Sequence, residues 1–382
     1  MKWFGGIVIT LVLVGAYVFY GVLPQRFDAR NNVVLPHEPY AVSEAARSLH
    51  DTIPVADLHS DMLLWRRDPA KPQSRGHTDL PRLREGGVAL QVFTAVTKTP
   101  PALNYDENSA DKDALTLLMV AQAWPFRTWG SIYERAAYQA GRLDDLERRE
   151  DGNFIFVKNK SDLQEALDQG VLAGIYGVEG AHPLEGELDN IDRLYVAGLR
   201  VMGLQHLFDN ELGGSLHGQS GAGLTAFGRD AVTRAVSKGL IIDVAHSSEQ
   251  VVRDVLALTD KPVIVSHTGL NGHCDSPRNI SDDLMKAIAD HGGLIGVGFW
   301  DGAVCDPSIE NIADAIVYAI TLLGVEHVAL GSDYDGTVTT VFDASELPAL
   351  TQALMDAGLD ESAIRAVMGE NAVRFFLDHL PD

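Results

Sequence analysis

The sequence predicts a TIM-type (β/α)8 barrel preceded by one N-terminal transmembrane helix, and three observations lead to this prediction. Buried apolar runs alternate with segments of helical periodicity along most of the chain. Six of the eight apolar runs end in or are closely followed by His, Asp or Glu, and the carboxyl ends of barrel strands meet at one mouth. From Trp3 to Leu23 the chain is almost wholly apolar.

Length and charge narrow the class of protein further. The chain has 382 residues, of which 46% are hydrophobic and 22% charged, an ordinary globular composition. α/β barrels run past about 250 residues as single domains, so one large domain accounts for the length. The formal net charge of −23, without a basic run, excludes nucleic acid as a partner, because a polyanion would be repelled.

The N-terminal apolar run predicts a membrane anchor. It contains no charged side chain, and at a helical rise of about 1.5 Å per residue it covers roughly 30 Å, the thickness of a bilayer core. The run lacks an Ala-x-Ala-like cleavage site, so we expect a single-pass anchor over residues 1–25, with a cleaved signal peptide as the alternative. Residues 26–41, which include Pro36 and Pro39, predict a linker, and residues 42–382 form the barrel domain.

The elements of the barrel follow in order. Residues 42–50 predict a short helix that is capped by Ser43. We expect the eight strands at 53–61, 88–96, 172–178, 201–205, 240–245, 263–266, 294–299 and 327–332. We expect helices at 109–149, 161–169, 189–198, 228–238, 248–258, 281–291 and 309–323.

The strand ends predict a metal site. His59 and Asp61 lie two residues apart on the first strand, so their side chains point the same way and can reach one ion. An imidazole with a carboxylate suits zinc or a similar divalent metal. The pair alone is a weak signal. It gains weight because further strands end at Glu179, His206, His246, His267 and Asp333.

The two cysteines, Cys274 and Cys305, leave the compartment open. They cannot form a disulfide framework or a thiolate zinc site. We expect free buried thiols, although one bridge is compatible with an oxidising compartment.

Several spaced motifs resemble those of a known family. They are His59-Ser-Asp61, Gly177-Val-Glu179-Gly180, His206, Asp243-Val-Ala-His246-Ser, Ser266-His267, Arg278-Asn279 and Gly331-Ser-Asp333-Tyr-Asp335-Gly336. In this order, from about residue 50 to residue 376, the chain resembles the membrane (renal-type) dipeptidases, peptidase family M19, which are amidohydrolase-like metal-dependent barrels. Mammalian members carry a C-terminal lipid anchor, whereas this chain ends without an apolar tail, so we expect its anchor at the N-terminus.

The resemblance implies a zinc-dependent dipeptidase that attacks the peptide bond with a metal-bridging hydroxide. Two Zn²⁺ ions per chain are implied, with other divalent metals left open. Two such ions lower the pKa of a shared water, and a guanidinium fork matches a substrate carboxylate. The implied roles are one metal on His59 and Asp61, the other on His246 and His267, Glu179 bridging both, His206 facing the substrate, Arg278 on the substrate carboxylate and Asp333 as acid/base.

Alternatives stay open. A related binuclear amidohydrolase acting on a lactam or an N-acyl amino acid would use the same metals, and a membrane-tethered binding barrel without catalysis is the third reading. Arg278 could instead form an ordinary surface ion pair, and His206 could be structural. We interpret His182, Asp243 and Asp335 as groups that orient the ligands or bind backbone.

The expected partners are a dipeptide and the membrane, and the sequence leaves a homodimer open. By analogy with the family we expect the catalytic domain on the periplasmic or extracellular side. The segment 97–151 matches the family least, and we expect it to cover the mouth of the site.

Overall fold

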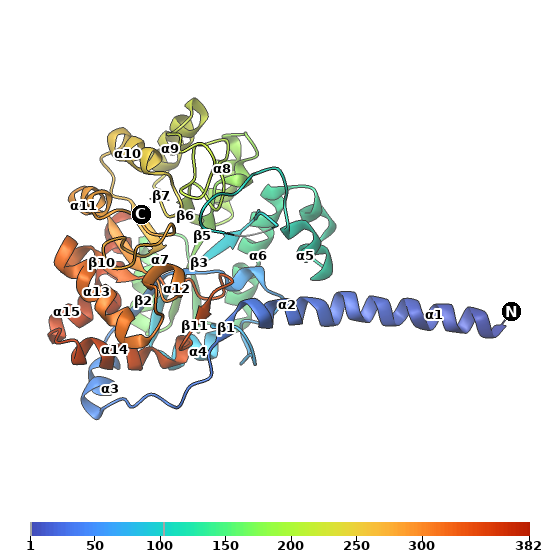
Figure 1. Ribbon diagram of the computed structural model, residues 1–382, viewed down its shortest axis with the longest axis horizontal. Helices are drawn as coiled ribbons and strands as arrows, with labels where there is room; N and C mark the ends of the chain where they lie inside the picture. The colour runs from blue at the N-terminus through green and yellow to red at the C-terminus, as the bar shows by residue number, and fades with distance from the viewer. Residues whose placement is uncertain (1, 102–103) are drawn as a thin grey trace.

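The computed structural model describes residues 2–101 and 104–382. Met1, which begins the predicted anchor, and residues 102–103, within the segment 97–151, lie outside the described residues. Figure 1 shows a rounded body of strands surrounded by helices, with one long helix that projects away from it.

Eight parallel strands close into the predicted barrel. Each strand pairs in parallel with its neighbours, β10 pairs with β2 and β3 pairs with β5, so the ring has no open edge. The strands are β2 (Val55–Ser60), β3 (Val88–Val96), β5 (Leu172–Glu179), β6 (Leu199–Gly203), β7 (Ile241–Asp243), β8 (Ile264–Thr268), β9 (Leu294–Val297) and β10 (Val328–Leu330).

Three further strands were not predicted. β4 (Phe154–Val157) pairs with the first half of β5, from Leu172 to Ile175. The second half of β5, from Tyr176 onward, pairs with β6 instead. β1 (Val33–Val34) pairs with β11 (Thr339–Thr340), which joins the N-terminal segment to the loop that follows β10.

The predicted helix at 109–149 is wrong as a single element. The chain forms α5 (Leu115–Ala121), a short turn η3 (Phe126–Trp129) and α6 (Ile132–Glu150). Pro125 has no N–H to donate and cannot continue a helix, and the side chain of Ser131 accepts a hydrogen bond from the N–H of Glu134 to begin α6. The periodicity was correct, but the break was missed.

The other predicted helices are confirmed within a few residues, and the Ser43 side chain caps α3 as expected. They are α3 (Glu44–His50), α7 (Lys160–Gln169), α8 (Asp189–Val196), α9 (Ala226–Ser237), α10 (Glu249–Leu258), α11 (Asp282–Asp290) and α13 (Ile309–Leu323). The remaining elements are α4 (Leu80–Glu85), α12 (Asp301–Val304), α14 (Leu347–Asp356), α15 (Glu361–Arg365) and α16 (Asn371–His379), with short turns η2 (Met62–Leu64), η4 (His182–Leu184), η5 (Val325–His327), η6 (Ala344–Glu346) and η7 (Ala366–Glu370).

The core lies between the strands and their helices. Leu58, Ile175 and Ala329, from three different strands, form one buried cluster with Phe376 of α16. Burying such a cluster holds the barrel at the end where the strands begin and leaves the other end for polar groups.

The N-terminal segment is one continuous helix, made of α1 (Lys2–Tyr17), η1 (Val18–Val22) and α2 (Leu23–Asn31). The stretch Gly6–Asn31 is long and apolar enough to cross a membrane, and its α1 part projects from the body (Figure 1). Part of the predicted linker 26–41 is therefore helical, because α2 packs on the barrel instead of extending away from it. The division into 1–25, 26–41 and 42–382 stays a prediction.

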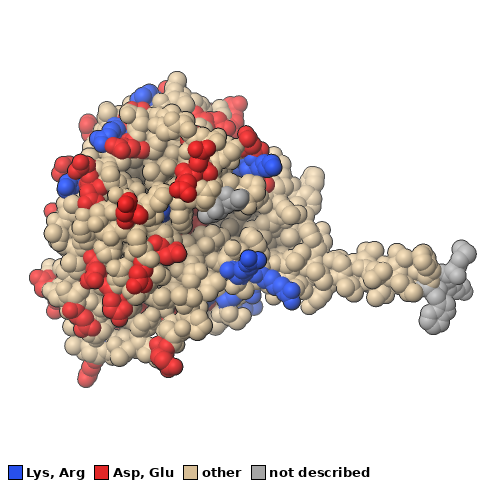
Figure 2. Space-filling view, viewed as in Figure 1, with Lys and Arg blue, Asp and Glu red and all other residues tan. Residues whose placement is uncertain are grey.

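The charged surface is uneven. Figure 2 shows Lys and Arg side chains gathered where the projecting helix meets the body, whereas Asp and Glu are spread over the rest of that face. Arg26, Arg30 and Arg66 are exposed, and Arg66 Nη1 donates to the carbonyl oxygen of Tyr20 over 2.8 Å. The sequence contains no basic run, so this cluster arises only from the fold.

The expectation of free thiols is wrong. Cys274 and Cys305 form a disulfide, with their Cα atoms 5.6 Å apart. Cys274 lies in the loop after β8 and Cys305 directly after α12, and the barrel places these two segments side by side. Sequence separation alone gave no sign of this proximity.

Candidate metal centre

The predicted ligands all lie at the carboxyl ends of barrel strands. His59 is on β2, Glu179 is the last residue of β5, and His267 is on β8. The side chains that follow β2, β6, β7 and β10 are Asp61, His206, His246 and Asp333, and all are buried. Because parallel strands bring these ends to one mouth, residues far apart in the chain form one cluster.

Glu179 occupies the centre of the cluster. Its Oε1 lies 3.1 Å from His246 Nε2 and 3.3 Å from His267 Nε2. The same Oε1 is 3.7 Å from His59 Nε2, and Oε2 is 3.3 Å from His206 Nε2. One carboxylate thus faces four imidazoles, which is the position that a bridging ligand needs.

Two groups of side chains lie on opposite sides of Glu179. On one side, His59 Nε2 lies 3.5 Å from Asp61 Oδ1 and 3.8 Å from Asp333 Oδ1. On the other, the Nε2 atoms of His246 and His267 are 2.9 Å apart. Three overlapping groups have ligand atoms within 4.8 Å of one another: His59, His267 and Asp333; Glu179, His206 and His246; and His59, Asp61 and Glu179.

The backbone is strained at two of these residues. His246 has φ 61° and Asp333 has φ 59°, in the left-handed region that non-glycine residues seldom adopt. Asp243 stabilises the turn before His246, because its Oδ1 accepts from the N–H groups of Ala245 and Ser266. These turns direct the side chains inward. The two hydrogen bonds of Asp243 confirm its interpretation as a backbone-binding group.

Hydrogen bonds orient the imidazoles. The hydroxyl of Ser266 lies 3.1 Å from His59 Nδ1 and 3.0 Å from His267 Nδ1, and His206 Nδ1 is 3.3 Å from the carbonyl oxygen of Lys98. Thr94 Oγ1 donates to Asp61 Oδ1 over 2.7 Å. The contacts at Nδ1 fix the orientation of these rings and turn their Nε2 atoms toward the centre of the cluster, where Thr94 Oγ1 also lies 3.1 Å from His59 Nε2.

Burial favours the neutral form of three histidines. It lowers the pKa of His206 to about 4, and it lowers the pKa values of His246 and His267 well below the usual range, with further lowering by Arg278. A neutral imidazole is the form that binds a metal.

Burial raises the pKa values of two carboxyl groups, whereas it lowers those of the three histidines. Burial raises the pKa of Glu179 well above its ordinary value and that of Asp333 to about 8, and the charge of Asp61 raises both further. Burial alone would lower the pKa of His59, but Asp61, Glu179 and Asp333 raise it to about 10. Carboxylates held together in a dry site repel one another, and a divalent cation removes that repulsion. The donor set therefore fits divalent metal.

Arg278 does not form the surface ion pair that was the alternative for it. Its side chain is 1% exposed, and Nη2 donates to the carbonyl oxygen of His267 over 2.9 Å. Its Cζ lies 5.1 Å from the centre of the Trp300 ring. Within residues 2–101 and 104–382, no carboxylate lies within 4 Å of the guanidinium. A buried cation without a paired carboxylate is costly, so an anion bound beside the guanidinium would be stabilised.

Other predicted supporting groups behave as follows. Asp335 binds backbone as expected, because its Oδ1 accepts from the N–H of His77. It also accepts from Thr78 Oγ1 and pairs with Arg67 Nη2 over 2.8 Å. His182 stacks on Phe208, with ring centres 4.9 Å apart, beside the site.

The sequence interpretation missed part of the site wall. A cavity of about 450 Å³ is lined by Asp61, Glu179 and His206, and also by Phe27 and Asn31 of α2. Residues 26–41 were interpreted as a linker, so neither residue was considered. The helical spacing of Phe27, Asn31 and the buried Asp28 and Asn32 is the signal that indicates a packed helix.

The family model for membrane dipeptidases (peptidase family M19) matches residues 43–378 of the chain. This range includes every predicted ligand, and it begins after α2.

Two solved structures agree with that match, and one further sequence relative has no functional description. A dipeptidase described as a metallopeptidase of family M19 is 29% identical, with a TM-score of 0.70, over 86% of this chain and 99% of the other. A metallopeptidase from Rhodobacter sphaeroides, bound to a phosphinate mimic of the dipeptide L-Ala-D-Ala, is 27% identical, with a TM-score of 0.69, over 86% and 99%. A Klebsiella pneumoniae protein described as an uncharacterized protein in the pqqA 5′ region is 30% identical over 251 residues, or 62% of this chain and 93% of that protein.

Proposed function

This chain belongs to the membrane dipeptidase family, whose members are metal-dependent peptide-bond hydrolases, and from that premise we propose that it is a zinc dipeptidase with two Zn²⁺ ions at the barrel mouth. The observation that carries the proposal is the position of Glu179, whose two oxygens face four imidazoles within 3.7 Å. In this assignment His59 and Asp61 would hold one ion, His246 and His267 would hold the other, and Glu179 would contribute to both.

The ions, when bound, would supply a hydroxide at neutral pH and polarise the peptide carbonyl. The chain's own residues do the rest. His206 presents Nε2 toward the same space. Because its Nδ1 faces the carbonyl oxygen of Lys98 and donates to it, His206 donates from Nε2 to the negative charge that develops on the substrate carbonyl oxygen as the imidazolium, a form that this negative charge favours. Asp333 takes a proton at its carboxylate and passes it to the amine that leaves.

Arg278 selects substrate length in this proposal. A dipeptide carries its terminal carboxylate one residue after the scissile bond, where the buried guanidinium, which has no carboxylate within 4 Å in the described residues, can bind it. A longer peptide places no carboxylate there. The dipeptide mimic bound to the Rhodobacter sphaeroides relative supports this substrate class.

We place the barrel outside the cytosol, tethered by the N-terminal helix. The support is the length and composition of Gly6–Asn31 together with the Cys274–Cys305 disulfide, since such bridges persist in oxidising compartments. A homodimer stays a prediction.

The test is a substrate panel with the full chain, purified in detergent and loaded with Zn²⁺. Simple dipeptides should be hydrolysed, a chelator should abolish the activity, and Zn²⁺ should restore it. Hydrolysis of N-acyl amino acids or lactams without hydrolysis of any dipeptide would favour the related amidohydrolase. Stoichiometric metal without turnover of any amide would favour a binding protein.

A further inference from the structure

The helix that continues the anchor forms part of the substrate cavity. Phe27 and Asn31 line the cavity of about 450 Å³ that reaches Asp61, Glu179 and His206. The family match begins only at residue 43, so this wall lies outside the region that the chain shares with the family.

Most of the cavity wall away from the ligands is apolar. The rings of Phe27 and Trp65 lie with centres 6.0 Å apart, and Phe27 is 47% exposed although it is a large aromatic side chain. The apolar lining also includes Leu64, Val96, Pro100, Pro101, Leu115 and Leu118. An aromatic side chain that lines a concave, largely apolar wall has the character of a binding surface.

The helix α2 is held firmly enough to define a wall. Asp28 is 2% exposed, and its Oδ2 lies 2.7 Å from Arg75 Nε and 3.2 Å from Arg67 Nε. Asn32 donates to Asp28 Oδ1 over 2.9 Å and accepts from the N–H of Thr337 over 3.0 Å.

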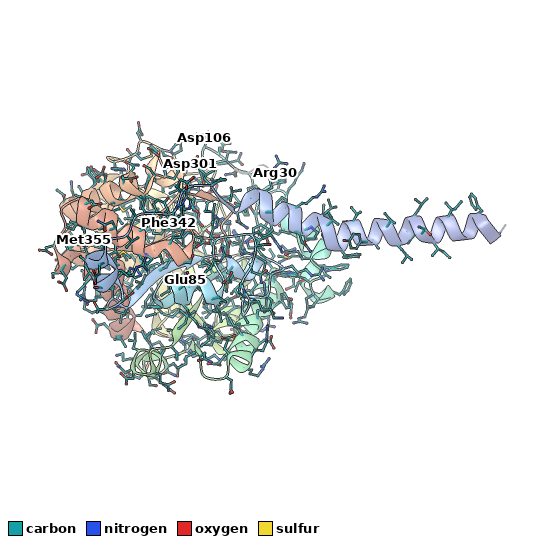
Figure 3. The ribbon with its side chains drawn as sticks, turned by 90° about the horizontal axis from the view of Figure 1, so that it is seen from below. Arg30, Glu85, Asp106, Asp301, Phe342 and Met355 are labelled. Carbon is teal, nitrogen blue, oxygen red and sulfur yellow. A yellow bond between two sulfur atoms is a disulfide. The ribbon has the colours of Figure 1, made fainter. Side chains whose placement is uncertain are left out.

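These contacts join α2 to the loop that carries Asp333. Arg67 also pairs with Asp335, and the pairing of β1 with β11 continues the connection at Thr339–Thr340. Figure 3 shows Arg30 of α2 on the same side of the molecule as Asp106 and Asp301, which follow barrel strands β3 and β9. The helix therefore lies at the mouth of the barrel.

The position of the cavity relative to Arg278 decides which part of a dipeptide enters it. Arg278 contacts His267 and Trp300, on the side of β8 and β9. The cavity contacts Asp61 and His206, on the side of β2 and β6. A dipeptide with its carboxylate at Arg278 directs its amino-terminal residue into the cavity.

We propose that α2 completes an apolar subsite for the side chain of the amino-terminal residue of the substrate, with Phe27 as a specificity-determining residue. The proposal rests on the dipeptidase function proposed above. It makes the segment next to the anchor part of the substrate site, and it commits to dipeptides whose first residue is large and apolar.

The experiment compares Phe27→Ala with the full-length wild-type chain in detergent, using Leu-Gly, Phe-Gly, Gly-Gly and Gly-Leu. The ratio of kcat/KM for Leu-Gly to that for Gly-Gly should fall about tenfold, because removing one apolar contact in a pocket changes selectivity by at least about that factor. The ratio for Gly-Leu to Gly-Gly should stay within about twofold. Phe27→Trp, which narrows the cavity, should lower kcat/KM for Phe-Gly relative to Gly-Gly more than it lowers kcat/KM for Leu-Gly relative to Gly-Gly.

Leu23→Ala is the matched control, since Leu23 lies one turn earlier on α2, is also 47% exposed, and does not line the cavity. It should leave all ratios unchanged. Equal ratios in Phe27→Ala and Leu23→Ala would overturn the subsite, as would an effect confined to Gly-Leu. If the wild-type chain hydrolyses none of the dipeptides, the proposed function itself fails, and the two failures are thereby distinguished.

Discussion

Replacing Arg278 by Met should remove the preference for a substrate with a free carboxylate while leaving the fold intact. The guanidinium is buried, donates to the carbonyl oxygen of His267 over 2.9 Å, and has no carboxylate within 4 Å in the described parts of the chain. Burial also lowers its pKa. A substrate carboxylate would be the first carboxylate in direct contact with it.

The size of the effect follows from that geometry. Truncating one partner of a buried hydrogen-bonded charge pair costs about 2–5 kcal/mol. At about 1.4 kcal/mol per tenfold, kcat/KM for a dipeptide should fall between roughly 30-fold and roughly 4,000-fold. The free energy of unfolding should change by less than about 2 kcal/mol, because the lost charged hydrogen bond offsets the relief of burying an unpaired cation.

The assay measures kcat/KM for a dipeptide and for the same dipeptide with a C-terminal amide. The wild-type enzyme should favour the acid strongly, and Arg278→Met should hydrolyse both at similar, low rates. Arg200→Met is the matched control. Arg200 is 6% exposed, donates to the carbonyl oxygens of Leu199 and Tyr195, and lies near the start of β6, away from the mouth.

Arg200→Met should change stability without changing the ratio of acid to amide. If Arg278→Met keeps the wild-type ratio, Arg278 does not bind the carboxylate and the argument from its missing counter-charge is refuted.

Four further outcomes are expected. Glu179→Gln should lose at least one metal per chain by elemental analysis together with nearly all turnover, and retention of both metals would contradict a bridging role. Asp333→Asn should keep the metals and lose turnover, so a loss of zinc on this change would make Asp333 a ligand. Replacing Cys274 and Cys305 by Ser should lower the free energy of unfolding by about 3–4 kcal/mol, because the disulfide closes a loop that spans 31 positions. Chemical denaturation measures this change, and an unchanged midpoint would contradict the expected stabilisation. Asp28→Ala removes the carboxylate that pairs with Arg67 and Arg75, so it should destabilise the chain by about 3–5 kcal/mol, and Asp28→Asn should destabilise it less. Faster proteolysis within α2 would show that the helix has loosened.

Much of the barrel could be predicted because its signals are local. A buried strand is a short apolar run, and its end is marked by the first polar residue, so β3 was placed at its observed bounds and Glu179 at its observed strand end. The ligand types followed from the chemistry of imidazole and carboxylate, which depends on the residue and not on its surroundings.

Other features depended on contacts that no local pattern records. The break at Pro125 was missed because the helical period continues on both sides of it. The disulfide joins residues that are 31 positions apart, and α2 was interpreted as part of a linker because its partners Arg67 and Arg75 lie far along the chain. β4 pairs beside β5 only where β6 leaves space.

The sequence by itself determined the barrel class and the identity of the candidate ligands, since periodicity and side-chain chemistry are properties of short segments. Only the tertiary structure decided how those ligands meet. Closing the ring brings Ser266 to His59, across 207 positions, and places Glu179 between four imidazoles. It also buried Arg278 with no carboxylate within 4 Å among the described residues, and it set Phe27 against the cavity. The physical reason is that burial and charge environment are sums over neighbours from the whole chain, and those neighbours exist only once the barrel is closed.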